Sequence, residues 1–165
     1  MKRTLLLLAT LSLMCVTASA QQQQRRAQRN YPDRTEAYSR WLSEDVVYII
    51  TPQEKQAFLM LKSDEERERF IDQFWSRRDT NPSTSENEYR AEYYSRIAYA
   101  NEHFAYGDTQ GWRTDRGRIY IIYGKPDEVQ KSSSGETWVY NFLPERGRNV
   151  RMEFVNQAGD FRLRQ

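Results

Sequence analysis

The stretch GWRTDRGRIYIIYG, residues 111–124, stands between two parts of the chain that differ in hydrophobic period. Before it, apolar residues recur every three or four positions, which is typical of amphipathic helices. After it, apolar and polar residues alternate, which is typical of strands with one covered face. The stretch therefore marks the junction of a helical N-terminal half and a sheet, and the sequence predicts an α+β fold.

The helical half is predicted to contain about four helices. The first follows an apolar stripe that runs from about Thr35 to Ile50. Thr51 and Pro52 then carry the signals of a helix start, because Thr is a preferred N-cap and Pro fits the first helical position. A second amphipathic helix is expected from that point.

Two further helices complete this half. Ser63 and Glu66 have the spacing of a capping box, in which each side chain satisfies a backbone amide near the other, so a helix should begin there. A long aromatic helix is expected from about Glu86 to Tyr106. Gly107 is its predicted stop, since glycine readily adopts the left-handed conformation that follows many helices.

The C-terminal half is predicted to be an antiparallel meander of three to four strands packed on the helices. Residues 118–123 are apolar on both faces, as in a central strand covered by helices. Alternating segments follow at 137–142, 150–154 and 161–164. Residues 156–159 read as a hairpin turn that joins the last two strands.

The first twenty residues have the features of a secretory signal peptide. A positive start precedes a short apolar segment, and cleavage is expected after Ala20. Lipoprotein processing at Cys15 is the alternative, but Met14 occupies a position that needs a small residue. Residues 21–34 form a polar leader, and residues 35–165 are expected to be a single domain. The predicted location is the periplasm or the extracellular space.

Removal of the signal peptide changes the charge balance. The chain has 25 Lys and Arg, and loss of Lys2 and Arg3 leaves 23 against 23 Asp and Glu. A neutral chain argues against a nucleic-acid partner, which normally needs a basic face. Cys15 leaves with the signal, which excludes disulfides and cysteine-based zinc sites. No second apolar segment is long enough to span a membrane.

The pentapeptide at residues 111–115 has the form G-W-x-T-D and lies between the long aromatic helix and a Y-G-x-P-D-E segment at residues 123–128. In this the chain resembles the bacterial GWxTD-domain family. The similarity extends from about Tyr31 to the C-terminus and includes Trp41-Leu42, the Phe74-Trp75 region, residues 96–101 and residues 117–120. The resemblance implies an exported bacterial protein and brings with it no established reaction.

Two interpretations of the pentapeptide are open. In the first, the pentapeptide is a structural joint. Gly111 supplies an unusual backbone angle, and the side chain of Trp112 packs between the helices and the sheet. Thr114 and Asp115 accept hydrogen bonds from backbone amides in the turn. As a catalytic site, Asp115 is an acid or base, and the neighbouring arginines bind an anionic substrate. Those arginines are Arg113 and Arg116.

His103 supports the enzyme alternative, since it is the only histidine and lies shortly before the pentapeptide. Paired with Asp115, it could act as a general base on an envelope peptide or glycan. No serine stands in a recognisable nucleophile setting. One histidine without cysteines offers no metal ligand set, so neither a metal nor another cofactor is expected.

Arg77 and Arg78 form a second group of arginines beside aromatic residues. They could hold an anion, or they could bond exposed carbonyls and a nearby carboxylate such as Asp79 or Glu88. The favoured function is a non-catalytic interaction module with a protein or cell-envelope partner, because aromatics and arginines are common interface anchors. The candidate binding residues are Trp112, Arg113, Thr114, Asp115, Arg116, Arg77 and Arg78.

Overall fold

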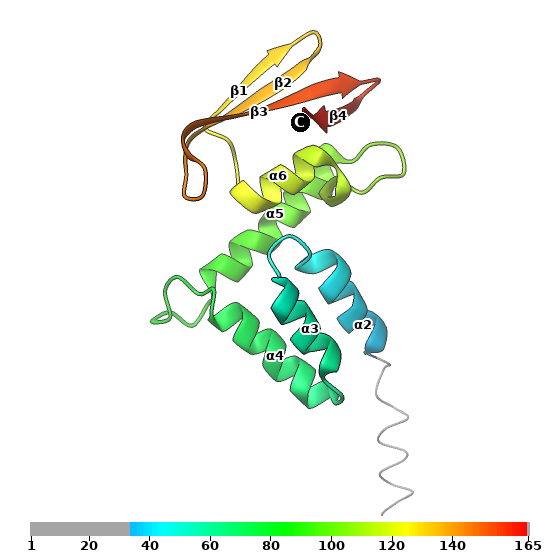
Figure 1. Cartoon of the computed structure of the whole chain (residues 1–165), viewed down its shortest axis with the longest axis vertical. Helices are drawn as coiled ribbons and strands as arrows, with labels where there is room; N and C mark the ends of the chain where they lie inside the picture. The colour runs from blue at the N-terminus through cyan, green and yellow to red at the C-terminus, as the bar shows by residue number, and fades with distance from the viewer. Residues whose placement is uncertain (1–33, 165) are drawn as a thin grey trace, which may run out of the picture. The chain divides into compact units, whose positions relative to one another are not determined.

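The computed structural model describes residues 34–164 (Figure 1). The predicted signal peptide and all but the last residue of the predicted leader lie outside the described residues. Residues up to Ser39 form a unit of their own, and a second compact unit runs from Arg40 to the C-terminus. Most of the first described helix lies in the first unit, and the other elements and all the sites described below belong to the second.

The first predicted helix is shorter than the apolar stripe suggested. Helix α2, Thr35–Arg40, continues into a π-helical turn, Trp41–Asp45, and the helix ends there. The expectation of a helix to Ile50 is wrong. The amides of Ile49 and Ile50 both bond to the carbonyl of Val46, which closes a turn. The following Thr51-Pro52 pair favours this stop, because proline disfavours helical geometry in the residue before it.

Helices α3 and α4 begin where the sequence predicts. Helix α3 spans Pro52–Met60 and α4 spans Asp64–Ser76. Both predicted cap residues carry complete capping boxes: the Thr51 hydroxyl accepts from the amide of Glu54, and the Ser63 hydroxyl accepts from the amide of Glu66. These caps satisfy amides that a helix start leaves unpaired.

Helix α5 spans Glu88–Phe104, close to the predicted range. Its N-cap is Asn87, whose side chain accepts from the amide of Arg90 at 2.8 Å. Gly107 does adopt the left-handed conformation, with φ of 54°. It lies inside the turn closed by Tyr106 and Thr109, however, rather than at the helix end.

The predicted strand at residues 118–123 is wrong, because this segment belongs to helix α6, Asp115–Tyr123. A short 3₁₀ helix, Gly111–Arg113, precedes it. Helix α6 packs between α5 and the sheet, as Figure 1 shows, and it contacts β4 (Asp160–Leu163). A helix covered on two sides is apolar nearly all round, so its sequence loses the one-sided stripe of a surface helix.

The sheet is an antiparallel meander in the order β1-β2-β3-β4, which confirms the α+β prediction. Its first three strands are Glu128–Ser132, Gly135–Leu143 and Gly147–Gln157. The predicted hairpin turn joins β3 to β4, with Ala158 and Gly159 both at positive φ. The Asn156 side chain accepts from the amide of Gly159 at 2.7 Å.

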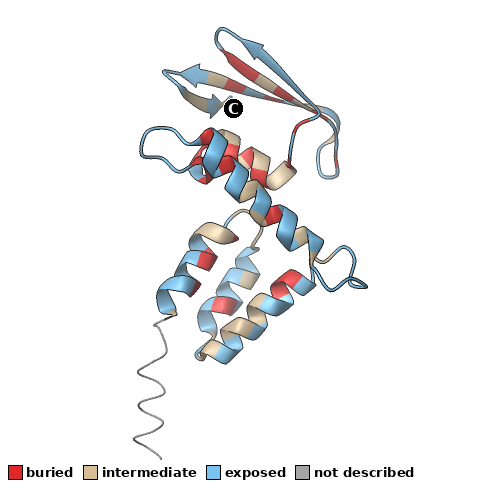
Figure 2. Ribbon diagram, turned by 180° about the vertical axis from the view of Figure 1, so that it is seen from behind, coloured by how far each residue is buried: buried red, intermediate tan, exposed pale blue. Residues whose placement is uncertain are grey.

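Apolar side chains on one face of the sheet form the core with α5 and α6, and Figure 2 shows these buried positions on the strands and helices that face each other. Trp138, Tyr140, Met152 and Phe154 are buried there. Phe142 continues the same row but is 59 % exposed at the far end of β2. Trp41, Phe58, Phe74 and Trp75 are buried in a separate aromatic cluster of the helices.

Candidate functional site

The pentapeptide lies where three backbone segments touch. A Cβ added to Gly111 would overlap the carbonyl oxygen of Ala100 in α5, and a Cβ added to Gly117 would overlap the carbonyl oxygen of Gly111. We call Ala100, Gly111 and Gly117 the glycine joint. The expectation that Gly111 supplies an unusual backbone angle is wrong, since it lies in the 3₁₀ helix without a positive φ. Close approach is what requires glycine here.

Thr114 caps helix α6 from within the joint. Its hydroxyl accepts from the amide of Gly117 at 3.1 Å and donates to the carbonyl of Gly111 at 2.8 Å. Thr114 is buried, so both bonds are shielded from water. The hydroxyl therefore closes the joint by linking its two glycines.

Asp115 ties the start of α6 to the last strand. One carboxylate oxygen accepts from the amide of Leu163 in β4 at 2.9 Å, and the other lies 3.1 Å from the guanidinium of Arg118. From the sequence, Asp115 was expected to accept an amide within its own turn. The acceptor role is present, but the amide comes from a strand 48 residues later.

Trp112 anchors the joint to the helical side. Its amide donates to the side chain of Asn101 in α5, and its carbonyl accepts from the hydroxyl of Tyr48 at 2.8 Å. The ring packs against Tyr48, with 6.2 Å between ring centroids. The partner ring therefore comes from the loop before α3, not from the sheet as expected. Arg113 is exposed, stacks on Trp112 and lies 3.8 Å from Glu44.

Arg116 is the one arginine of this segment held between aromatic rings. Its guanidinium lies 5.1 Å from the ring centroid of Phe104 and 4.0 Å from that of Phe161. It also lies 3.4 Å from Glu136, a buried carboxylate on β2. The indole of Trp138 donates to the same oxygen of Glu136 at 3.0 Å. Cation–π contacts and the ion pair together fix Arg116 in one position.

A hollow of about 340 Å³ opens beside Arg116, between α5, α6 and the first two strands. We call it the aromatic cleft. The rings of Tyr99 and Tyr120 stack at 4.5 Å along it, and Phe104 and Trp138 pack behind them. Two exposed lysines, Lys125 and Lys131, also line it, together with Val129 of β1. The cleft thus combines an aromatic wall with a basic rim.

His103 lies at the cleft but not in a catalytic pair. Its ring stacks on Tyr99 at 3.9 Å, and Nδ1 lies 3.1 Å from the carbonyl of Tyr99. Asp115 is absent from the residues that line the cleft. Its side chain bonds to Leu163 and Arg118, and no hydrogen bond joins it to His103 in the described part of the chain. The structure therefore gives the two residues separate partners.

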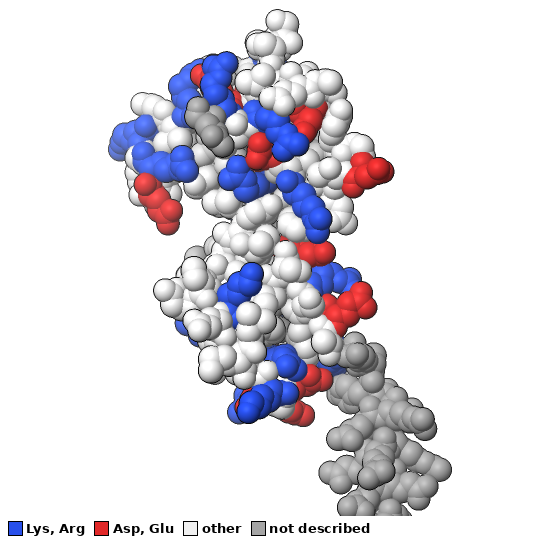
Figure 3. Space-filling view, turned by 45° about the vertical axis from the view of Figure 1, so that its right-hand side comes forward, with Lys and Arg blue, Asp and Glu red and all other residues white. Residues whose placement is uncertain are grey.

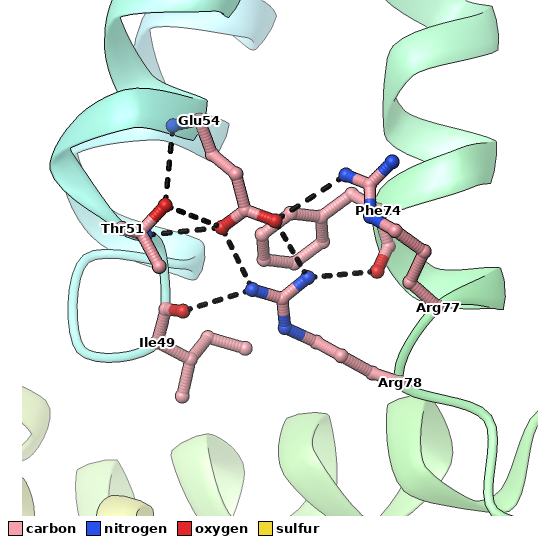
Figure 4. A network of polar contacts seen from close by, with 6 residues as sticks. All are labelled: Ile49, Thr51, Glu54, Phe74, Arg77 and Arg78. Carbon is pink, nitrogen blue, oxygen red and sulfur yellow. Dashed lines mark hydrogen bonds and ion pairs between the residues drawn. The ribbon is translucent and has the colours of Figure 1, made fainter.

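Arg77 and Arg78 do bind a carboxylate, but it is Glu54 of α3 and not Asp79 or Glu88 (Figure 4). We call Glu54, Arg77 and Arg78 the glutamate–arginine network. Arg78 lies 2.8 Å from Glu54 and donates to the carbonyls of Ile49 and Phe74. Its guanidinium also covers the Phe74 ring at 3.6 Å. These contacts join α3 to the end of α4 and use both terminal nitrogens of Arg78 internally.

The network also determines the acidity of its carboxylate. Partial burial alone raises the pKa of Glu54, because it disfavours the charged form. The hydrogen bonds from Arg78 and from the Thr51 amide, with the charge of Arg78, outweigh burial and lower the pKa from 4.5 to about 2. Glu54 is therefore charged throughout the physiological pH range.

Most residues of the aromatic cleft were missed in the sequence analysis. Tyr99 and His103 are four residues apart on α5, a spacing that places two side chains on one helix face. The sequence alone therefore indicated that Tyr99 and His103 lie side by side. Tyr120 was assigned to a strand, and Lys125 and Lys131 stand in turn and strand segments without a local motif. Only the fold brings these residues to one cleft.

A comparison with protein families supports the resemblance. The family model described as the GWxTD domain matches residues 13–165. The chain belongs to the GWxTD domain family. Comparisons of this GWxTD protein with curated proteins and with solved structures found no match.

Neither a metal-ligand cluster nor a membrane-spanning helix is found among the described residues. Among residues 34–164, no group of three or more His, Cys, Asp and Glu side chains is placed to hold a metal ion. In the same part of the chain, no helix is both long and apolar enough to cross a membrane.

Proposed function

We propose that this GWxTD protein is an exported interaction module, acting without catalysis in the periplasm or outside the cell. In this proposal, it binds an extended segment of a partner protein along strand β1. The supporting observation is that the aromatic cleft opens directly beside an edge strand. The signal-peptide pattern of residues 1–20 is the basis for the export part of the proposal.

Strand β1 has the properties of a docking edge. It pairs with β2 on one side, and in the described structure no strand pairs with its other side. All five of its residues are exposed. An unpaired edge offers a row of free amides and carbonyls, to which an extended peptide can add as a further strand.

The cleft beside this edge indicates which peptide would fit. Val129 and Lys131 alternate along β1 on the side that lines the cleft. A guest strand would place its own alternate side chains over the same hollow. An apolar side chain would contact Tyr99 and Tyr120, and a carboxylate two residues away would face Lys131 or Lys125.

Charge supports an acidic guest. The one carboxylate that lines the cleft, Glu136, is already bonded to Arg116 and Trp138. Neither Lys125 nor Lys131 has an ion-pair partner among the described residues. Two unpaired ammonium groups beside an aromatic wall favour a segment that alternates apolar and acidic residues.

The test uses fluorescein-labelled nine-residue peptides, one alternating Phe and Glu over its centre and one alternating Phe and Lys. Fluorescence anisotropy should detect the Glu peptide and not the Lys peptide. Lys131→Glu should weaken binding about tenfold or more, because it replaces attraction with repulsion. Lys55→Glu, the same change at another exposed lysine, on α3, is the matched control. Amide exchange of β1 should slow when the Glu peptide binds.

Equal binding of the two peptides, or an unchanged affinity in Lys131→Glu, would contradict the proposal. Mass spectrometry of the incubated peptides separates it from the enzyme alternative. Cleavage that disappears in both Asp115→Asn and His103→Gln would favour the enzyme instead.

A further inference from the structure

Basic and acidic side chains lie close together on the part of the molecule formed by the sheet and α6, as Figure 3 shows. A cation in such surroundings is available to a ligand only where no neighbouring carboxylate neutralises it. In the aromatic cleft the carboxylate is Glu136, and the Lys and Arg residues are Arg116, Lys125 and Lys131. Which of them pairs with Glu136 therefore decides which ones can bind a partner.

Lys131 and Glu136 are directly opposite each other on β1 and β2. Opposite residues of an antiparallel pair point to the same face of the sheet, with Cβ atoms about 4.5–5.5 Å apart, and opposite charges in such a pair attract. Both residues line the cleft. In the described part of the chain, however, the ion pair of Glu136 is with Arg116, and Lys131 has none.

Arg116 reaches Glu136 from helix α6. Its guanidinium lies 3.4 Å from Oε1 of Glu136, the same oxygen that accepts from the Trp138 indole. The side chain is 17 % exposed, and the two aromatic rings described above hold the guanidinium in place. An exposed lysine must lose side-chain freedom to form the same ion pair, whereas this arginine is already ordered. Arg116 therefore pairs with Glu136 in preference to Lys131.

We infer that Arg116 determines the charge preference of the aromatic cleft without contacting the guest peptide. By neutralising Glu136, it leaves Lys131 charged and unpaired, at the position where the guest carboxylate lies in the proposed function. The inference rests on that proposed peptide binding at β1. It makes Arg116 a positioning residue, which acts through Glu136 and Lys131.

The first experiment compares two fluorescein-labelled peptides, in which Phe alternates with Glu or with the uncharged Gln. Fluorescence anisotropy measures both affinities at one pH and one salt concentration. In Arg116→Met, Glu136 should pair with Lys131, and the preference for the Glu peptide should fall about fivefold or more. A purely structural effect would weaken the binding of both peptides equally and leave this preference unchanged.

The double variant Arg116→Met/Glu136→Gln separates an indirect role of Arg116 from a direct one. Removing both charges leaves Lys131 unpaired again, so the preference for the Glu peptide should return to within about twofold of wild type. Glu136→Gln alone should keep or exceed the wild-type preference. If Arg116 bound the guest carboxylate directly, the double variant would lose the preference that Glu136→Gln retains. This comparison holds even if Arg116→Met alone does not fold.

The matched control is Arg118→Met, which removes one positive charge from the same helix. Arg118 does not line the cleft and pairs with Asp115 at 3.1 Å. This variant should keep the wild-type preference for the Glu peptide. Thermal unfolding of each variant verifies that it is folded.

A second measurement needs no peptide. Brief acetylation with acetic anhydride, followed by mass spectrometry, reports the reactivity of each lysine. A carboxylate at ion-pair distance favours the ammonium form, which does not react. Lys131 should therefore react more slowly in Arg116→Met than in wild type or the double variant. The exposed Lys55 on α3 should react equally in all three proteins.

Unchanged reactivity of Lys131 in Arg116→Met would overturn the inference. So would a double variant that lacks the preference of Glu136→Gln, or an equal loss of preference in Arg118→Met. Failure of the wild type to bind either peptide would contradict the proposed function instead. The acetylation result would then still decide whether Arg116 keeps Lys131 unpaired.

Discussion

The glutamate–arginine network and the glycine joint hold their surroundings together in opposite ways. The network depends on side chains that are present, because one arginine bonds a carboxylate, two carbonyls and an aromatic face. The joint depends on side chains that are absent, because Gly111 and Gly117 let three backbones touch. Both regions place arginines beside carboxylates and aromatics, so residue type alone does not distinguish them.

The two regions should therefore respond differently to substitution. A network of side chains loses the contribution of the group removed, and its neighbours can relax or take up water. A backbone contact cannot relax without moving a whole helix, since protein interiors are close-packed. Small additions at the joint should cost more than large deletions in the network.

The largest effect is expected for Gly117→Ala. Its methyl group would overlap the carbonyl oxygen of Gly111, and backbone on both sides prevents relief. We expect a loss of more than about 4 kcal/mol in unfolding free energy, or no folded protein. Urea unfolding followed by circular dichroism measures it.

Gly107→Ala is the matched control for this change. A Cβ there meets nothing within 4 Å, and the only penalty is the left-handed backbone. That penalty is about 1–2 kcal/mol. Equal stability of the two variants would show that the joint is not closely packed.

Glu54→Gln should have the next largest effect. It leaves Arg78, whose side chain is 18 % exposed, without its carboxylate. Breaking a fully buried pair costs about 3–5 kcal/mol, and partial exposure reduces this to about 2–3 kcal/mol. Arg77→Gln is the control, because Arg77 is 51 % exposed and should contribute below about 1 kcal/mol. Thermal unfolding of both variants measures the two losses of stability. A larger loss in Arg77→Gln than in Glu54→Gln would contradict the prediction.

The same network predicts a dependence of stability on pH. The folded protein lowers the pKa of Glu54 to about 2, whereas the unfolded chain has the ordinary value of 4.5. The stabilisation is complete above about pH 4.5 and is lost as pH falls towards 2, by about 2–3 kcal/mol. Between pH 7 and pH 2, the unfolding free energy should decrease less in Glu54→Gln than in wild type. Parallel curves would contradict the assignment.

Asp115→Ala tests the polar part of the joint. Removing the carboxylate leaves the amide of Leu163 without its acceptor, which should cost about 1–3 kcal/mol and several degrees in melting temperature. Asp108→Ala, in the exposed turn after α5, is the control. An unchanged midpoint in Asp115→Ala would make the pentapeptide turn a leading candidate for a working site.

The smallest effect is expected for Arg113→Ala. Arg113 is 56 % exposed, its distance to Glu44 is 3.8 Å, and its remaining contact is the face of Trp112. Exposed pairs contribute below about 1 kcal/mol. A loss larger than that of Asp115→Ala would show that the joint extends to its solvent-exposed rim.

Local signals allowed most of the helical half to be predicted. The helix starts after Thr51 and Ser63 could be predicted from the sequence, because a capping box involves residues only three positions apart. The hairpin at residues 156–159 was predictable for the same reason. Helix α6 was not, because burial on two sides removed its stripe, and β-branched Ile119 and Ile121 favoured a strand.

The site residues were harder to predict than the fold. Thr114 and Asp115 were correctly expected to accept amides, but the distant partner of Asp115 is set by tertiary structure. The same holds for Arg78, whose carboxylate comes from 24 residues earlier. Sequence patterns identify a residue that needs a partner, and only packing selects which one it receives.

The bond from Leu163 to Asp115 also affects the order in which the chain can fold. It closes a loop of 48 residues, whereas the helix caps close loops of three. Long loops lose more entropy on closure, so distant contacts form late and local ones early. The helices can therefore form while the sheet is still open. The bond between α6 and the sheet forms only with strand β4, which follows all of the described helices along the chain.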